Sequence, residues 1–235
     1  MQRYIVDNEK LILDEGDKRH IINVMRMKID DTFEIVYNKT IYLCKITNID
    51  KKDFSYEVIN ELKSNNEKKV KVILLCSIIK EQKMDFLIQK ATELGVDEIV
   101  PVISERTVVK INDKKDNKIN RWNKIIKEAT EQSHRLEMPK LHEITSLKHI
   151  ESYDNSLKIV CNTQELSKNI KKVLQDNRKD DTIVIVVGPE GGFSSREIDF
   201  LVEKGFISVT LGENIFRAET VPLYLLSVIS YEFLR

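Results

Sequence analysis

The stretch VVGPEGGFSSREIDFL, residues 186–201, joins an apolar run to a polar segment through a loop that holds three of the seven glycines in the chain. The run before the loop, TIVIVV at 182–187, has the length and the β-branched composition of a buried strand. Beyond the loop, Ser194 and Glu197 form a capping-box pattern that predicts the start of a helix, and Gly205 is placed to end it. The sequence therefore predicts a loop at the carboxyl end of a strand, where open α/β sheets bind ligands.

The glycines of this loop indicate more than a turn. One glycine suffices to reverse the chain, so Gly188, Gly191 and Gly192 together favour a backbone that approaches a bound molecule closely. The one charged residue, Glu190, is a hydrogen-bond acceptor and suits a neutral or cationic group. A P-loop would need a lysine where Phe193 stands, and the chain has no GxGxxG, GxSxG or HExxH motif. A triphosphate or a dinucleotide is therefore a poor fit, and we expect no metal ion.

Outward from this loop, predicted strands and helices alternate from residue 70 to the C-terminus. The expected strands are 70–77, 98–104, 157–162, 182–188 and 207–212, and the expected helices are 84–95, 119–134, 166–176, one from Ser195 and one at the C-terminus. Strands that are apolar on both faces and separated by helices predict a parallel sheet covered on both sides, which is an α/β fold.

The first part of the chain has a different pattern. Four runs with strand character, at 3–6, 32–37, 40–49 and 53–62, predict a small β domain, and Asn38-Lys39 occupies a hairpin position. Residues 62–69 are polar and charged, which is typical of a linker. The expected domains are therefore 1–66 and 70–235.

Composition limits the classes of protein to be considered. Lysine and arginine number 38 and are balanced by 38 aspartate and glutamate residues, so a surface for nucleic acid must come from local clusters of charge. Cys44, Cys76 and Cys161 are widely spaced and odd in number, which fits reduced thiols. The sequence shows no signal peptide and no apolar run long enough to cross a bilayer. We expect a soluble, cytoplasmic protein.

A second unusual loop, LGENIFRAET at 211–220, follows the next predicted strand. Together with GPEGGFS at 188–194, it resembles the RsmE family, the SPOUT-class enzymes that methylate N3 of a uridine in 16S ribosomal RNA. Four further motifs occur in the order that the family has: HIINVMRMK at 20–28, QKATELGV at 89–96, ERTV at 105–108 and RWNKIIKEATEQSHR at 121–135. The resemblance therefore covers the whole chain.

The resemblance implies a fold and a set of partners. It implies an N-terminal PUA-like β-barrel that binds RNA, followed by a SPOUT methyltransferase domain whose parallel sheet ends in a trefoil knot. S-adenosyl-L-methionine is the implied cofactor, and 16S ribosomal RNA or the small ribosomal subunit is the implied partner. A homodimer is also implied, through the C-terminal helix, whose sequence VPLYLLSVISYEFL is apolar nearly all round. Two departures affect site roles: His134 stands where the family has a small residue, and Ala218 lacks the hydroxyl of a threonine.

The reaction itself suggests catalytic residues. The N3 proton of uridine is about as acidic as a tyrosine phenol, with a pKa of about 10, so it must leave before or while the methyl group arrives. We expect Arg217 to stabilise the developing negative charge, and Glu219 or Glu190 to orient the substrate or accept the proton. An ion pair that braces the loop explains Glu219 equally well.

The expected cofactor-binding residues lie in three loops, each of which follows a predicted strand: Gly188, Glu190, Gly191, Gly192, Leu211, Gly212, Ile215, Phe216, Asn162 and Thr163. Ordinary core packing is the alternative for the apolar residues among them, and turn formation is the alternative for Asn162 and Thr163. The expected RNA-binding residues are basic side chains inside family motifs: Arg3, His20, Arg26, Arg106 and Arg135.

The sequence is also compatible with two other functions. The chain could be a non-catalytic RNA-binding protein that retains the fold, or an α/β enzyme that acts on a small nucleotide. A binding protein would have no need of the glycine loop or of Arg217, whereas a nucleotide enzyme would need phosphate-binding lysines that both loops lack.

Overall fold

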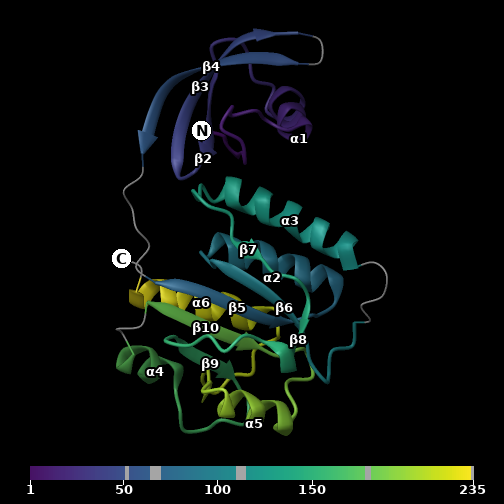
Figure 1. The fold of residues 1–235 in the computed structure, drawn as a ribbon, viewed down its shortest axis with the longest axis vertical. Coiled ribbons are helices and arrows are strands. Elements are labelled where there is room, and N and C mark those ends of the chain that lie inside the picture. Colours follow the sequence, from purple (N-terminus) through teal and green to yellow (C-terminus); the bar gives the residue numbers. More distant parts are fainter. Residues whose placement is uncertain (51–52, 64–69, 110–114, 178–180, 234–235) are drawn as a thin grey trace. The chain divides into compact units, whose positions relative to one another are not determined.

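The chain forms two compact units, seen in a computed structural model that describes residues 1–50, 53–63, 70–109, 115–177 and 181–233 (Figure 1). The first unit comprises Met1–Glu67 and Lys127–Met138, and the second comprises Lys68–Ile126 and Pro139–Arg235. The first unit is thus assembled from two separate segments of the sequence. Most of the expected linker, residues 64–69, lies outside the described residues.

A parallel sheet forms the centre of the second unit. Its strands are β5 (Lys71–Ser77), β6 (Glu98–Ile103), β7 (Lys140–Leu141), β8 (Thr145–Ser146), β9 (Leu157–Cys161), β10 (Thr182–Val187) and β11 (Ile207–Val209). The order is β11-β9-β10-β5-β6-β7, β8 also pairs with β6, and each of these pairs is parallel. The predicted parallel sheet is confirmed. The two-residue strands β7 and β8 were not predicted because so short a segment has no periodicity.

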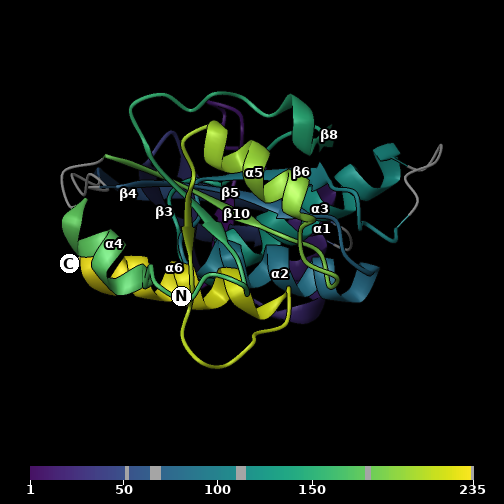
Figure 2. The same cartoon turned by 90° about the horizontal axis from the view of Figure 1, so that it is seen from below.

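Helices cover both faces of this sheet. They are α2 (Glu81–Glu93), α3 (Lys115–Gln132), α4 (Ile170–Asp176), α5 (Ser195–Glu203), α6 (Thr220–Phe233) and a 3₁₀ turn at Leu147–His149, with α3 contributing its residues up to Ile126. Figure 2 shows α2 and α6 on one face and α5 on the other. The strands alternate accordingly: Leu74 and Ile185 point to the α2–α6 side, and Leu75 and Val186 point to the α5 side.

Local hydrogen bonds explain why one helix starts later than expected. Residues 166–169 were expected to be helical, but the carboxylate of Glu165 accepts hydrogen bonds from the amides of Ser167 and Lys168 and closes a turn. The side chain of Asn169 then caps α4 by accepting from the amide of Lys171. Short polar side chains that bond to nearby amides compete with helix in this way.

The first unit is built on a four-stranded sheet of β1 (Arg3–Ile5), β2 (Thr32–Tyr37), β3 (Thr40–Ile49) and β4 (Phe54–Lys63), in that order. β1 and β2 are parallel and the other two pairs are antiparallel. Asn38 and Lys39 have φ values of 46° and 62°, so the predicted two-residue hairpin is confirmed. Helix α1 (Glu15–Arg19) and the π-helix His20–Val24 were not predicted.

The part of the chain expected to form a PUA-like β-barrel contains a single four-stranded sheet in the described residues. Within the described ranges, β1 and β4 lie at the two ends of the sheet and are not paired with each other. The sheet is therefore open, and its apolar face is covered by side chains from the segments between the strands. These include Leu11, Leu13 and Ile21, which pack on Phe33 and Ile46.

No helix in the described parts of the chain combines the length and the apolar composition that crossing a membrane requires.

Candidate active site

Three loops meet at one edge of the sheet in the second unit, because β11, β9 and β10 are adjacent and parallel. The loop after β10 begins at Gly188, the loop after β11 leads to α6, and the loop after β9 begins at Asn162. The three groups of residues expected to bind a cofactor therefore come from neighbouring strand ends.

Each glycine of the loop after β10 occupies its position for a different structural reason. Gly192 has a φ of +66°, and its amide donates to the carbonyl of Pro189 at 2.9 Å, which closes a turn. A Cβ on Gly188 would lie 3.2 Å from the Phe193 ring, so this glycine allows close packing. At Gly191 a Cβ would make an ordinary 3.5 Å contact with the side chain of Arg106. The close-approach explanation therefore fits Gly192, where no heavy atom lies within 4 Å of the Cβ position, better than Gly191.

The capping box that follows this loop is confirmed, and it has a second function. Ser194 accepts from the amide of Glu197, and Glu197 Oε2 accepts from the amide of Ser194. The other oxygen, Glu197 Oε1, accepts from the amide of Glu105 at 2.8 Å. This buried carboxylate therefore joins the start of α5 to the loop after β6.

Arg106 makes a second link between the same two loops. Its Nη1 donates to the carbonyl of Gly191 at 2.8 Å. The side chain was expected to contact RNA, but its exposed guanidinium is already bonded to the glycine loop. In this structure Arg106 supports the loop.

The loop after β11 contains a second glycine that needs its conformation. Gly212 has a φ of +124° and no heavy atom within 4 Å of its Cβ position. Leu211 is partly buried against the core, and the ring of Phe216 packs on Tyr224 with centroids 5.1 Å apart. Core packing does not explain Ile215, which is 80% exposed.

Charged groups from three elements meet beside these loops. Lys83 Nζ, in the first turn of α2, lies 3.3 Å from Glu219 Oε1 and 3.7 Å from Glu190 Oε1. Glu219 Oε2 is buried and has no hydrogen-bond partner within the described ranges. Arg217 is exposed, and its side chain forms no ion pair with any described residue. The structure thus brings Glu190 and Glu219 together through Lys83.

Sequence reasoning did not assign Lys83 to this cluster. Its partners lie far along the chain, in loops whose approach to α2 depends on the order of the strands. The only sequence signal was that Lys83 lies six residues before the QKATELGV motif.

The loop after β9 is mostly explained by turn formation. Asn162 Oδ1 accepts from the amide of Gln164 at 3.0 Å, and its Nδ2 is 3.3 Å from the hydroxyl of Ser208. Thr163 is exposed. Burial raises the pKa of the preceding Cys161 thiol to about 12, so it is not a ready nucleophile.

Two of the residues expected to bind RNA, Arg3 and His20, form hydrogen bonds within the first unit. Arg3 is only 7% exposed, its Nε donates to Glu34 at 2.8 Å, and its Nη1 donates to the carbonyl of His134. A guanidinium with these partners has little surface left for RNA, and the contact between Arg3 and RNA stays a prediction. The Nδ1 atom of His20 is hydrogen-bonded to the hydroxyl of Tyr4 at 2.9 Å.

The other two residues expected to bind RNA, Arg26 and Arg135, differ in exposure. Arg26 is exposed and has a φ of 52° in the segment after the π-helix. Arg135 is partly buried just beyond the end of α3, where its amide donates to the carbonyl of Thr130.

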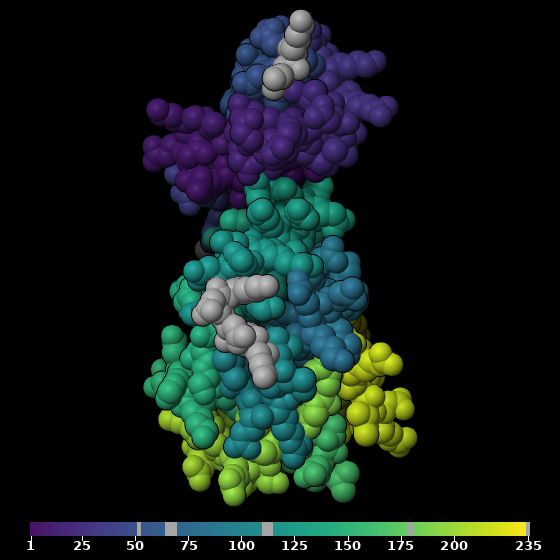
Figure 3. Space-filling model, turned by 90° about the vertical axis from the view of Figure 1, so that its right-hand side faces the viewer, coloured from purple at the N-terminus to yellow at the C-terminus, as the bar shows by residue number. Residues whose placement is uncertain are grey.

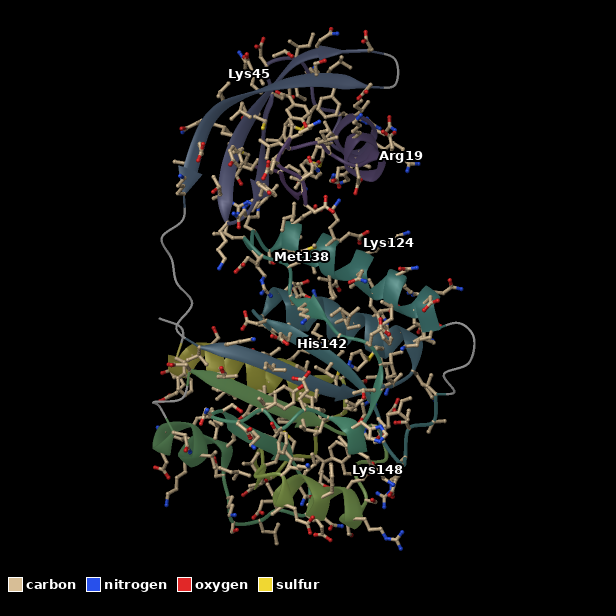
Figure 4. The ribbon with its side chains drawn as sticks, in the orientation of Figure 1. Arg19, Lys45, Lys124, Met138, His142 and Lys148 are labelled. Carbon is tan, nitrogen blue, oxygen red and sulfur yellow. The ribbon has the colours of Figure 1, made fainter. Side chains whose placement is uncertain are left out.

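Potential metal ligands do not gather in the part of the chain that the structure describes. No group of three or more His, Cys, Asp or Glu side chains in the described ranges is arranged to hold a metal ion. The cysteines at 44, 76 and 161 are free thiols. His142, labelled in Figure 4, contacts Glu98 Oε2 at 2.5 Å, and Lys71 contacts the other oxygen of that carboxylate.

Comparison with known proteins identifies the family. Residues 66–230 match the RNA methyltransferase domain and residues 13–59 match the RNA methyltransferase PUA domain. The chain is 35% identical to ribosomal RNA small subunit methyltransferase E of Bacillus subtilis, over 99% of this chain and 97% of the relative. It is 36% identical to the protein of the same name from Aquifex aeolicus, over 93% of each.

Solved structures indicate the same family. A ribosomal RNA small subunit methyltransferase E from Neisseria gonorrhoeae, bound to S-adenosyl methionine, is 30% identical with a TM-score of 0.86, over 98% of this chain and 97% of that one. A Legionella pneumophila structure in complex with the cofactor SAM is 28% identical with a TM-score of 0.90, over the same shares. The chain therefore belongs to the ribosomal RNA small subunit methyltransferase E family.

Proposed function

We propose that this protein methylates N3 of a uridine in 16S ribosomal RNA and uses S-adenosylmethionine as the methyl donor. The names of the relatives support ribosomal RNA as the substrate, and two similar structures hold S-adenosylmethionine. The observation that carries the proposal is the cluster of Glu190, Glu219 and Lys83 beside two glycine-bearing loops. A protein that only binds RNA needs no such cluster.

The backbone of the two loops fits the proposed cofactor. The space beside Gly192 and Gly212 is open at the position of a side chain, so a flat or bulky ligand can approach the backbone there. Leu211 and Phe216 offer apolar surface, and the exposed Ile215 can cover a ligand from the loop. Gly188, Gly191 and Thr163 belong to the same proposed site.

The charge of the cluster of Glu190, Glu219 and Lys83 also fits S-adenosylmethionine. Two carboxylates and one ammonium leave one net negative charge, which attracts a sulfonium cation and does not attract a triphosphate. When bound, S-adenosylmethionine supplies an electrophilic methyl group on that positively charged sulfur.

The residues of the chain act on the uridine. Its N3 must lose a proton, and the negative charge that spreads to O2 and O4 must be stabilised. Arg217 is exposed and can donate hydrogen bonds to either oxygen. Glu219 has one oxygen without a partner in the described ranges and can accept the N3 proton. Glu190 holds the other side of Lys83 and can orient the base.

The proposal extends to RNA binding, oligomerisation and chain topology. Arg26 is an exposed cation in the first unit that can contact phosphate, and Arg135 is a second candidate. The proposed homodimer forms through α6, where Tyr231 is 82% exposed and therefore accessible to a second copy of the chain. The proposal also includes a trefoil knot in the segment that carries the two loops, as the resemblance to the family implies. Sedimentation of the wild type and of Tyr231→Asp tests the dimer, which the substitution should weaken.

The decisive experiment is methyl transfer to small ribosomal subunits that lack the modification, followed by nuclease digestion and mass identification of 3-methyluridine. Arg217→Ala should lower the single-turnover rate on the order of 10²- to 10³-fold, with little change in affinity for RNA or cofactor. Raising the pH should partly restore this variant, because more of the uridine is then ionised. Binding of RNA without any transfer would favour the non-catalytic alternative, and tight binding of ATP or NAD would favour a nucleotide enzyme.

A further inference from the structure

We propose that Lys83 is a positioning residue for methyl transfer, which holds Glu219 by one carboxylate oxygen so that the other oxygen is presented to the uridine imide. This inference rests on the proposed function. It assigns a role to a residue on α2, outside both loops.

The backbone of Lys83 is firmly anchored. Its amide donates to the carbonyl of Lys80 at 2.9 Å at the start of α2. The next residue, Met84, is fully buried, and so is Leu87 one turn further on. Helix α2 packs against α6, and the space-filling view shows the blue atoms of α2 next to the yellow atoms of the C-terminal segment (Figure 3). The ammonium of Lys83 therefore extends from a fixed element.

Glu219 is held as firmly at the other end of the contact. It lies directly before α6, between the buried residues Ala218 and Val221. Its side chain is mostly buried, with Oε1 at 3.3 Å from Lys83 Nζ and Oε2 without a partner in the described ranges. A buried carboxylate oxygen that lacks a donor destabilises the folded state unless a ligand supplies one. The imide N–H of uridine is such a donor.

Lys83 is the cation that fixes this carboxylate. The neighbouring Arg217 is exposed and makes no ion pair with Glu219 in the described structure. Without the ammonium, Glu190 and Glu219 would face each other as two like charges and would move apart. A displacement of about 1 Å in a reacting group can cost on the order of 10²-fold in rate.

This geometry separates catalysis from cofactor binding. Removing the Lys83 charge makes the cluster more negative, so it does not weaken the attraction for a sulfonium. The maximal rate should fall, while the affinity for S-adenosylmethionine should be kept or should rise. A side chain needed only for folding would affect both quantities together with thermal stability.

The test begins with wild-type protein and small ribosomal subunits, since absence of 3-methyluridine there would reject the proposed function itself. With that activity established, Lys83→Met should lower the maximal rate about 10- to 100-fold without weakening S-adenosylmethionine binding in calorimetry. Lys83→Arg should recover most of the loss, because it keeps the charge. Lys90→Met is the matched control: Lys90 lies on the same helix, pairs with Glu93 and has a similar exposure, 34% against 32% for Lys83. Its rate should stay at the wild-type level.

A double-mutant cycle tests whether Lys83 acts through Glu219. In a Glu219→Gln background, Lys83→Met should cost little more than Glu219→Gln alone. An equal slowing in both backgrounds would show that Lys83 acts independently of Glu219 and would overturn the inference. An unchanged rate for Lys83→Met in the wild-type background, or an equal loss in Lys90→Met, would overturn it as well.

Discussion

Each unit of the protein contains a lysine shared between carboxylates from separate segments, but the two clusters differ in how completely they are paired. Lys127 Nζ lies 2.7 Å from both Asp14 and Asp17 and 3.7 Å from Glu131, whose Oε1 also accepts from the amide of Ile5. Lys83 lies at 3.3 and 3.7 Å from its two partners and leaves one oxygen of Glu219 unpartnered in the described ranges. Short, complete pairing serves stability, whereas longer and incomplete pairing keeps groups available for a substrate.

The largest expected effect comes from breaking the complete cluster. Lys127→Met leaves Asp17 and Glu131 buried without their cation, which should lower the free energy of unfolding of the first unit by roughly 3 kcal/mol. Lys83→Met should cost less than about 1 kcal/mol, because its partners are already under-paired. Chemical denaturation followed in both variants measures the difference. Lys124→Met, an exposed position on the same helix as Lys127 (Figure 4), is the control, and equal losses at 83 and 127 would break the comparison.

The free energy of unfolding of the first unit should depend on pH, by somewhat less than the loss expected in Lys127→Met. Burial raises the pKa of Glu131 to about 7, from an ordinary value of 4.5, in spite of the nearby Lys127. Because the folded state then binds the proton more tightly, this contribution to stability is complete below about pH 4.5 and is lost as the pH rises to about 7.

Glu131→Gln should flatten that slope, by on the order of 2 kcal/mol across the interval. Burial also raises the pKa of Asp17, so a weaker slope of the same sign should remain at lower pH. Unfolding measured at several pH values in the wild type, in Glu131→Gln and in the exposed control Glu128→Gln decides this. A slope that persists in Glu131→Gln would place the titrating group elsewhere.

Backbone conformation beside the Lys83 cluster gives a third test. Gly212 has a φ of +124°, so Gly212→Ala should lower the free energy of unfolding by about 1 kcal/mol and should also weaken S-adenosylmethionine binding. Gly191→Ala has no such strain and makes only a 3.5 Å contact with Arg106, so it should be nearly neutral in stability. Calorimetry measures the affinity for S-adenosylmethionine and denaturation measures the free energy of unfolding in both variants. A larger loss in Gly191→Ala than in Gly212→Ala would contradict the prediction.

The smallest expected effect lies beside the Lys127 cluster. His134 ends α3 with a φ of 57°, a conformation that favours glycine, while its carbonyl accepts from Arg3. His134→Gly should therefore raise stability by about 0.5 kcal/mol, and His134→Ala should not, because alanine keeps the strain. A thermal shift of equal size in the two variants would exclude the backbone explanation.

Much of the fold could be predicted because local rules and the overall structure agree. The parallel strands, the hairpin at Asn38-Lys39 and the box of Ser194 and Glu197 all depend on residues close together in sequence. The open edge of the four-stranded sheet and the π-helix at His20–Val24 depend on pairing and packing between distant segments. Periodicity has no signal for those features.

The candidate site shows the same limit. Gly192 and Gly212 could be selected from sequence because glycine has a recognisable conformational role. The contacts of Lys83 with Glu219 and of Arg106 with Gly191 join segments whose neighbourhood is decided only by the strand order. The burial of Arg3 could not be predicted for a related reason: its partner Glu34 lies on a different strand, far along the sequence.

The division of the chain into units has a consequence for how the protein is made. Because the first unit includes Lys127–Met138, a ribosome that has released only the first 67 residues has not yet supplied the cation for Asp14 and Asp17 or the acceptor for the Ile5 amide. The N-terminal sheet must wait until more than half of the polypeptide has emerged before its polar groups are satisfied. A truncated fragment that ends in the 62–69 segment should for the same reason be a poor substitute for the complete unit, and RNA-binding measurements on such a fragment would describe a partly folded state.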